Sequence, residues 1–195
     1  MKELKLSVPD DKAQVFAKEM MELMRKHDVQ VEGLDSLLPI TERVKTFEDA
    51  CKELGDNNPL VIQFKEIYDN YLCDGGDGVK DIVAVLKLRI IVAALNEGWR
   101  PKFTEDEYRY FPWFVFYTQE ELDGMDEEDK KGIRVLGRSY YNAYAYAGVA
   151  FSYTSNASSN SGAALGGRLC FKNRELAEYA GQQFLAEYMD FIFCE

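Results

Sequence analysis

Long hydrophobic runs are absent from this chain. The longest apolar run is IIVAAL, from Ile90 to Leu95, whereas a helix that crosses a bilayer needs about 20 apolar residues. The first residues, MKELKLSVPDDKAQ, contain no apolar stretch of the kind found in secretory signal peptides. We therefore expect a protein without a membrane partner.

Histidine and closely spaced cysteines are also scarce. His27 is the single histidine, and no CxxC pair is formed by Cys51, Cys73, Cys170 and Cys194. Histidine-rich metal sites and the usual zinc or redox motifs are thereby excluded, and we predict no metal and no cofactor. A nucleophilic Ser-His or Cys-His pair would have to use His27, which lies in a polar stretch at a predicted helix end. We expect free thiols in a cytoplasmic protein.

Basic residues are outnumbered by acidic ones. The chain holds 23 lysines and arginines against 34 aspartates and glutamates, which gives a formal net charge of −11 at pH 7. No run of lysines and arginines marks a basic patch. Because such a chain repels phosphate backbones on average, we expect no direct nucleic-acid binding. An acidic surface favours a basic protein partner instead.

Apolar residues, by contrast, are plentiful enough for a folded core. Hydrophobic residues make up 47% of the 195 residues and aromatic residues 13%, which is unlike the composition of disordered chains. The length suits one ordinary domain, or one domain with a small lobe. We predict a small strand-helix unit at residues 1–33, as a candidate separate lobe, and a main α+β domain at residues 40–195.

The first half of the chain carries helix signals. Residues 2–8 alternate charged and apolar side chains, which predicts a short strand, and a helix is expected after Pro9. Thr46 is the predicted N-cap of the helix TFEDACKELG, and Pro59 begins another helix. Residues 79–98 are apolar around most of a helix circumference, so they predict a central, buried helix.

The second half carries strand signals, followed by one more helix. Residues 107–118, EYRYFPWFVFYT, predict an extended edge strand, and the acidic residues 119–129 predict a loop or a helical turn. Further strands are predicted at residues 138–155 and 168–171, before a final helix from Asn173. This order predicts an α+β fold, in which a helical N-terminal half packs on a mainly antiparallel sheet and a long C-terminal helix closes it.

The corner GGRLCFKN, residues 166–173, is a candidate anion site. Gly166 and Gly167 would allow close backbone approach, and Arg168 would supply the charge. The segment matches neither GxxxxGK[ST] nor GxGxxG, and its glycines precede the predicted strand, whereas phosphate loops follow one. A plain join of a strand to a helix, capped by Asn173, is the alternative.

Acidic residues offer candidates for metal or acid–base chemistry. DGGDG, residues 74–78, looks like part of a calcium loop, but the twelfth position from Asp74 is Val85 where an EF-hand has glutamate. Another carboxylate group flanks the predicted edge strand: Glu105, Asp106, Glu107, Glu120 and Glu121. No partner for general acid–base catalysis is identifiable beside them. We therefore assign no catalytic residue, and solvated charges beside an edge strand are the alternative.

Aromatic side chains crowd the predicted strands and are the main binding candidates. Alternation places Tyr108 and Tyr110 on one side of their strand, and Phe111 and Trp113 on the other. If one side is exposed, its aromatics would form a platform for a sugar, a base or a partner protein. The alternative is that helices cover both sides. The candidate binding residues are Trp99, Tyr110, Trp113, Tyr153 and Arg168.

Four longer stretches together form a recognisable pattern. They are ITERVKTFEDACKELG, IIVAALNEGWRPKFTEDEYRYFPWFVF, GVAFSYTS and GGRLCFKNRELAEYAGQQFLAEYMDFIF, which touch most of residues 40–193. This pattern resembles an uncharacterised family of proteins encoded by phages, prophages and mobile elements of Bacteroides-type gut bacteria, with TFEDAC, ALNEGW and RLCFKSRELAEYAG segments. Asn173 stands where the family pattern has serine, and both residues cap helices. The resemblance implies a phage or mobile-element protein of unknown function and carries over no catalytic residue.

Three hypotheses about function remain open at this point. The first is a non-enzymatic accessory protein that binds a protein partner in the host cytoplasm, through the aromatic sheet face or the corner from Tyr153 to Arg168. The second is an enzyme that uses carboxylates and tyrosines on a sugar or nucleotide, which requires a pocket with two carboxylates, or one carboxylate with Arg168. The third is a virion component, which would form stable oligomers. The sequence leaves the oligomeric state open.

Overall fold

The computed structural model describes residues 7–27, 33–72, 79–102, 104–130, 134–135, 148–157 and 166–193. Its helices and strands are α1 Ala13–His27, α2 Ile40–Arg43, α3 Phe47–Leu54, α4 Pro59–Ile67, α5 Lys80–Leu95, β1 Arg109–Tyr117, α6 Gln119–Gly124, β2 Arg134–Val135, β3 Gly148–Ala157, α7 Arg174–Gln183 and α8 Leu185–Phe193. The DGGDG turn and most of the predicted strand at residues 2–8 lie outside the described residues. So does the first part of the predicted strand at residues 138–155.

Capping side chains set the starts of the helices in the first half. The Thr46 hydroxyl accepts the Asp49 N–H at 3.1 Å, and the Asp49 carboxylate accepts the Thr46 N–H at 3.1 Å, which together form a capping box. At the start of α4, the Asn58 side-chain oxygen accepts the Leu60 N–H at 3.0 Å. The helices predicted from Thr46 and Pro59 are confirmed. The buried helix predicted within residues 79–98 is confirmed as α5.

The sheet is antiparallel and has the order β1-β3-β2. Tyr110 lies opposite Asn156 and Trp113 opposite Tyr153, and the register shifts between Trp113 and Phe114. The extended edge strand predicted within residues 107–118 is confirmed as β1. The acidic stretch that follows it begins with α6, so the helical turn was the correct alternative.

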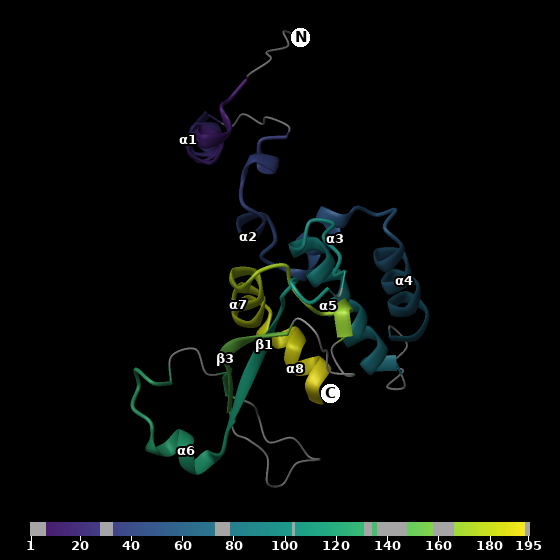
Figure 1. Cartoon of the computed structure of the whole chain (residues 1–195), viewed down its shortest axis with the longest axis vertical. Coiled ribbons are helices and arrows are strands. Elements are labelled where there is room, and N and C mark those ends of the chain that lie inside the picture. Colours follow the sequence, from purple (N-terminus) through teal and green to yellow (C-terminus); the bar gives the residue numbers. More distant parts are fainter. Residues whose placement is uncertain are drawn as a thin grey trace.

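Helices α7 and α8 lie directly against the sheet, and α5 packs against them (Figure 1). The Phe114 ring lies 5.0 Å from the Tyr188 ring, and the Phe116 ring 5.5 Å from the Phe193 ring, measured between centroids. The α+β fold with an antiparallel sheet and a C-terminal helix is confirmed. That closing helix is broken at Phe184, whose backbone (φ −109°, ψ 32°) leaves the helical region while its side chain is buried.

The strand predicted at residues 168–171 is wrong. Residues 166–168 form a single 3-10 turn, and Phe171 makes one isolated bridge to Tyr110 through two backbone hydrogen bonds of 2.9 and 3.1 Å. Leu169, Cys170 and Phe171 are all buried, so their side chains do not alternate between two faces. The side chain of Asn96 forms hydrogen bonds with the Cys170 carbonyl and the Lys172 N–H, in place of the backbone of a neighbouring strand.

Helix α1 stands at one end of the molecule, beyond α2 (Figure 1). The Lys18 Nζ atom lies 2.7 Å from a Glu42 carboxylate oxygen, which ties α1 to α2. The separation of residues 1–33 from residues 40–195 as a lobe stays a prediction. Among the described residues, no helix has both the length and the apolar character needed to cross a membrane.

Candidate functional site

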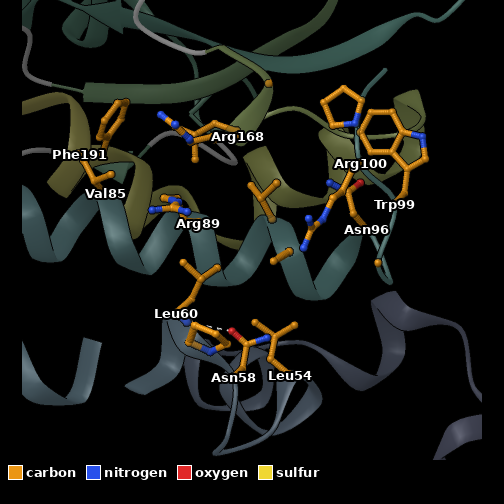
Figure 2. Close-up of a pocket in the computed structure, with 17 residues that line it drawn as sticks. Leu54, Asn58, Leu60, Val85, Arg89, Asn96, Trp99, Arg100, Arg168 and Phe191 are labelled. Carbon is orange, nitrogen blue, oxygen red and sulfur yellow. Dashed lines mark hydrogen bonds between the residues drawn. The ribbon is translucent and has the colours of Figure 1, made fainter. Parts of the chain in front are cut away.

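A pocket of about 930 Å³ opens beside α5 (Figure 2). Its walls come from the end of α3, the start of α4, one face of α5, the turn after α5, the 166–169 segment and α8. The lining residues are Leu54, Asn58, Pro59, Leu60, Val85, Arg89, Val92, Ala93, Asn96, Gly98, Trp99, Arg100, Pro101, Gly167, Arg168, Leu169 and Phe191. We call this the arginine pocket, because Arg89, Arg100 and Arg168 are its charged residues among those described.

One face of α5 forms the floor of the arginine pocket. Val85, Arg89 and Val92 follow one another at intervals of four and three residues, and Ala93 and the C-cap Asn96 continue the same face, so all five fall on one side of the helix. Most other side chains in the second half of α5 pack in the core, among them Leu88, Ile91 and Leu95. Arg89 is therefore a half-buried charge on the pocket face of a mostly apolar helix, whose other charged residues are Lys80, Asp81 and Lys87.

The turn after α5 carries the next two lining side chains. Glu97 has a φ of 50° and Gly98 a φ of 84°, so two successive residues adopt left-handed backbone. This conformation favours glycine, and it reverses the chain at the helix end. The Trp99 N–H donates to the Asn96 carbonyl at 3.0 Å, which closes the turn. Trp99 is half-buried in the pocket wall and Arg100 is exposed at its edge.

Asn96 holds the opposite wall in place. Its side-chain NH₂ donates to the Cys170 carbonyl at 2.8 Å, and its side-chain oxygen accepts the Lys172 N–H at 3.0 Å. Asn96 is 4% exposed; its hydrogen bond to the Cys170 carbonyl is buried and its hydrogen bond from the Lys172 N–H is partly buried. They fix the segment that presents Gly167, Arg168 and Leu169 to the pocket.

The charges of the pocket are uncompensated within the described part of the chain. There, Arg89, Arg100 and Arg168 take part in no ion pair or hydrogen bond, and no carboxylate joins them in the lining. Arg43 shows the contrast, because its guanidinium binds Glu53 and, at 2.8 Å, Glu97.

Glu97 is the acidic residue closest in sequence to the pocket turn, and it is already engaged. Its carboxylate lies 2.8 Å from the Arg43 guanidinium and 2.9 Å from the Lys172 Nζ atom. Two basic side chains from outside the pocket lining therefore neutralise it. The described lining of the pocket therefore carries three positive charges and no negative one, although the whole chain has a net charge of −11.

The thiol nearest to the pocket in sequence is poorly suited to nucleophilic chemistry. Cys170 is fully buried, and burial raises the pKa of its thiol to about 11. Its Sγ atom lies 3.2 Å from the Gly167 carbonyl oxygen, to which it donates. Because the thiolate is the reactive form, this sulfur is inert at neutral pH.

We expect Cys170 to resist alkylation in the folded protein. At pH 8, a thiol with a pKa of about 11 is roughly one part in a thousand thiolate. Iodoacetamide should therefore label the half-buried Cys51 well before Cys170, as read by peptide mass spectrometry. In guanidinium chloride the two thiols should react at similar rates. Equal rates in the native protein would contradict the burial of Cys170.

The structure brings two of the five candidate residues together. Trp99 and Arg168 both line the pocket, and the candidate anion corner contributes Gly167 to the same wall. Tyr110 packs against the core and bridges to Phe171, away from the pocket lining. Trp113 is 48% exposed on β1. Tyr153 in β3 lies opposite Trp113 in the strand register, and only its backbone is among the described parts of the structure.

The candidate carboxylates do not gather at the pocket. Glu105 and Asp106 are exposed, and Glu107 accepts the Lys102 N–H. Glu121 accepts the Thr118 N–H at 2.7 Å in the capping box of α6, which holds the pKa of its carboxyl below the usual value. Among the described residues, no group of three or more potential metal ligands is found.

Sequence reasoning missed Arg89, Arg100 and the two asparagines of the pocket. Arg89 carried a usable signal, since it interrupts an apolar run in a helix predicted to be buried. A charge at such a position either has a partner or faces a cavity. Asn58 and Asn96 had no signal of this kind, because asparagine is common at helix ends.

Comparison of the chain with protein-family models, with curated proteins and with solved structures finds no match. The resemblance to proteins of phages and mobile elements therefore stays a prediction. The function of the pocket has to follow from the chemistry of the residues that line it.

Proposed function

We propose that this chain is a binding protein and that the arginine pocket holds an anionic ligand. The observation that carries this proposal is the meeting of Arg89, Arg100 and Arg168 in one cavity, with no carboxylate beside them in the described lining. In a chain of net charge −11, chance would more often place acidic residues at such an opening.

The position of Arg89 adds an energetic argument. A half-buried guanidinium has lost part of its hydration, which costs free energy unless another group replaces the water. A bound carboxylate or phosphate would form charge-assisted hydrogen bonds with it, which are about twice as strong as neutral ones. Anion binding would therefore offset this cost.

The lining favours binding over acid–base catalysis. Its polar side chains are three arginines, two asparagines and the indole of Trp99, and none of these transfers a proton near neutral pH. The hypothesis of a carboxylate and tyrosine enzyme requires a pocket with two carboxylates, or with one carboxylate and Arg168. The described lining does not supply one, so this hypothesis has less support than binding.

Inorganic pyrophosphate tests the proposal in a thermal-shift experiment at low ionic strength. It should raise the Tm of the wild-type chain by several degrees, because a ligand of the folded state stabilises that state by mass action. Arg89→Met removes one of the three pocket charges at similar side-chain length and should greatly reduce the shift. Arg25→Met is the matched control, since it removes the same charge from the exposed end of α1.

Two results would overturn anion binding in the pocket. One is the lack of any Tm shift with millimolar pyrophosphate in the wild-type chain. The other is a shift of equal size in the wild-type chain and in Arg89→Met, which would place the anion elsewhere on the surface.

Protein-partner binding is the second candidate function, and two exposed aromatics favour it. Tyr108 is 52% exposed and Trp113 is 48% exposed, both at or beside the edge strand β1. Exposed tyrosine and tryptophan side chains are typical anchors of protein interfaces. A basic partner would suit the acidic remainder of the surface. This would be the accessory role of a phage or mobile-element protein in the host cytoplasm, and a virion component is its alternative.

A further inference from the structure

The arginine pocket has two chemically different ends. In Figure 2, Trp99 and Arg100 lie toward one end, while Arg89 and Arg168 lie toward the other, near Phe191. The indole of Trp99 with one guanidinium lies at one end, and two guanidinium groups with the Phe191 ring lie at the other, so the positive charge is greater at the second end. This arrangement matches a ligand that has a flat part and a charged part.

Helix α4 begins at the pocket, but its first residues contribute little to anion binding compared with the arginines. Asn58, Pro59 and Leu60 at the start of α4 line the pocket. The Leu60 N–H is already taken by the Asn58 side chain, and Pro59 has no N–H to offer. The partial positive charge of the α4 N-terminus adds to the field, but these first two residues supply no free donor.

The walls and the size of the pocket limit the ligand further. Leu54, Leu60, Val85, Val92 and Leu169 give it apolar sides. A volume of about 930 Å³ is at the upper end of the range for small-molecule and cofactor sites. An inorganic anion would occupy a small part of this space and would leave the apolar sides and Trp99 without a contact.

We propose that the anionic ligand is a nucleotide, with its base against Trp99 and its phosphates between Arg89 and Arg168. This inference rests on the proposed function and names the ligand class for the same site. Arg100, exposed beside Trp99, is placed to cover the ribose or the base edge. Stacking tolerates any base, since every base has an aromatic face.

Calorimetric titrations with ADP, pyrophosphate and adenosine separate the two parts of the ligand. Base stacking on an aromatic side chain is expected to make ADP bind about 10-fold more tightly than pyrophosphate. Trp99→Leu should reduce the affinity for ADP to that for pyrophosphate and leave pyrophosphate binding unchanged. Arg89→Met should weaken both, and adenosine alone should bind weakly. Arg25→Met again serves as the control for charge.

Fluorescence gives a second measurement that does not depend on a variant of the pocket. The chain has two tryptophans, Trp99 and Trp113, so Trp113→Phe leaves Trp99 as the single indole reporter. ADP should change the emission of Trp99, because the base contacts its ring. Pyrophosphate, which reaches only the arginines, should change it much less.

The outcomes distinguish the nucleotide from the anion. If ADP and pyrophosphate bind equally and both depend on Arg89, the nucleotide inference is wrong and the proposed function stands. If neither binds, both fail. If a hexaglutamate peptide binds more tightly than ADP and depends on Arg89, the ligand is an acidic protein segment and the nucleotide inference is again wrong.

Discussion

Asn96→Ala is expected to lower the free energy of unfolding by about 2–4 kcal/mol. The change removes the donor to the Cys170 carbonyl and the acceptor of the Lys172 N–H, and it leaves both backbone groups without these partners. Because the hydrogen bond to the Cys170 carbonyl is buried, its loss leaves a buried acceptor without this partner, which carries most of the expected cost. Urea unfolding followed by circular dichroism measures the loss.

Asn96→Asp is the matched variant, because it keeps the size of the side chain and replaces only the NH₂ group by an oxygen. The new carboxylate can still accept the Lys172 N–H but cannot donate to the Cys170 carbonyl. Burial opposes the charged form, so the pKa of the new carboxyl should be higher in the folded chain than in the unfolded one. The stability deficit relative to wild type should therefore shrink as the pH falls from 7 to about 4.

Either variant could contradict this role of Asn96. A loss below about 0.5 kcal/mol in Asn96→Ala would mean that the two hydrogen bonds do not hold the wall of the pocket. A deficit of Asn96→Asp that stays constant with pH would mean that the new carboxyl is solvated, so the site would be open to water.

Helix starts were predictable from sequence because their causes are local. Thr46 and Asp49 are three residues apart, and Asn58 precedes Pro59 directly, so each cap is visible within one turn of helix. The apolar run of α5 predicted burial for a similar reason, since its composition leaves no polar face for water. These signals need no knowledge of distant residues.

The strand at residues 168–171 was predicted wrongly because its backbone partner is distant. Leu169 and Phe171 alternate with Arg168 and Cys170 as in a strand, but the hydrogen bonds of this segment go to the side chain of Asn96 and to the single bridge at Tyr110. A side chain that substitutes for a neighbouring strand leaves no trace in the local pattern.

The candidate site was only partly predictable for the same physical reason. Trp99 and Arg168 were predicted as binding residues, and Arg168 follows the two glycines of the candidate anion corner. Arg89 matters because it meets Arg168 in one cavity and has no acidic partner there among the described residues. The proximity of Arg89 to Arg168 results from the way α5 and the 166–169 segment line the same pocket. The sequence alone does not reveal it, because the two segments are far apart along the chain.

Phe171→Ala is expected to lower the free energy of unfolding by about 3–5 kcal/mol. Phe171 is fully buried, and it belongs to the core formed with residues of α5, α7 and α8. Removing its ring loses the burial of the apolar surface and leaves a cavity that its neighbours fill incompletely. The backbone bridge to Tyr110 does not depend on the side chain, so the loss should come from packing alone.

Phe171→Leu is the control that distinguishes a loss of core packing from a failure of the chain to fold. Leucine keeps most of the apolar volume, so this variant should lose about 1 kcal/mol, fold cooperatively and bind pyrophosphate like the wild-type chain. Urea titrations of the three proteins should give equal m-values if the transition remains two-state. A loss below about 1 kcal/mol in Phe171→Ala would contradict close packing at this position, because the empty space would then have to be filled by movement of the 166–172 segment. Such movement would also displace Arg168 from the pocket, so it should appear as weaker binding of pyrophosphate.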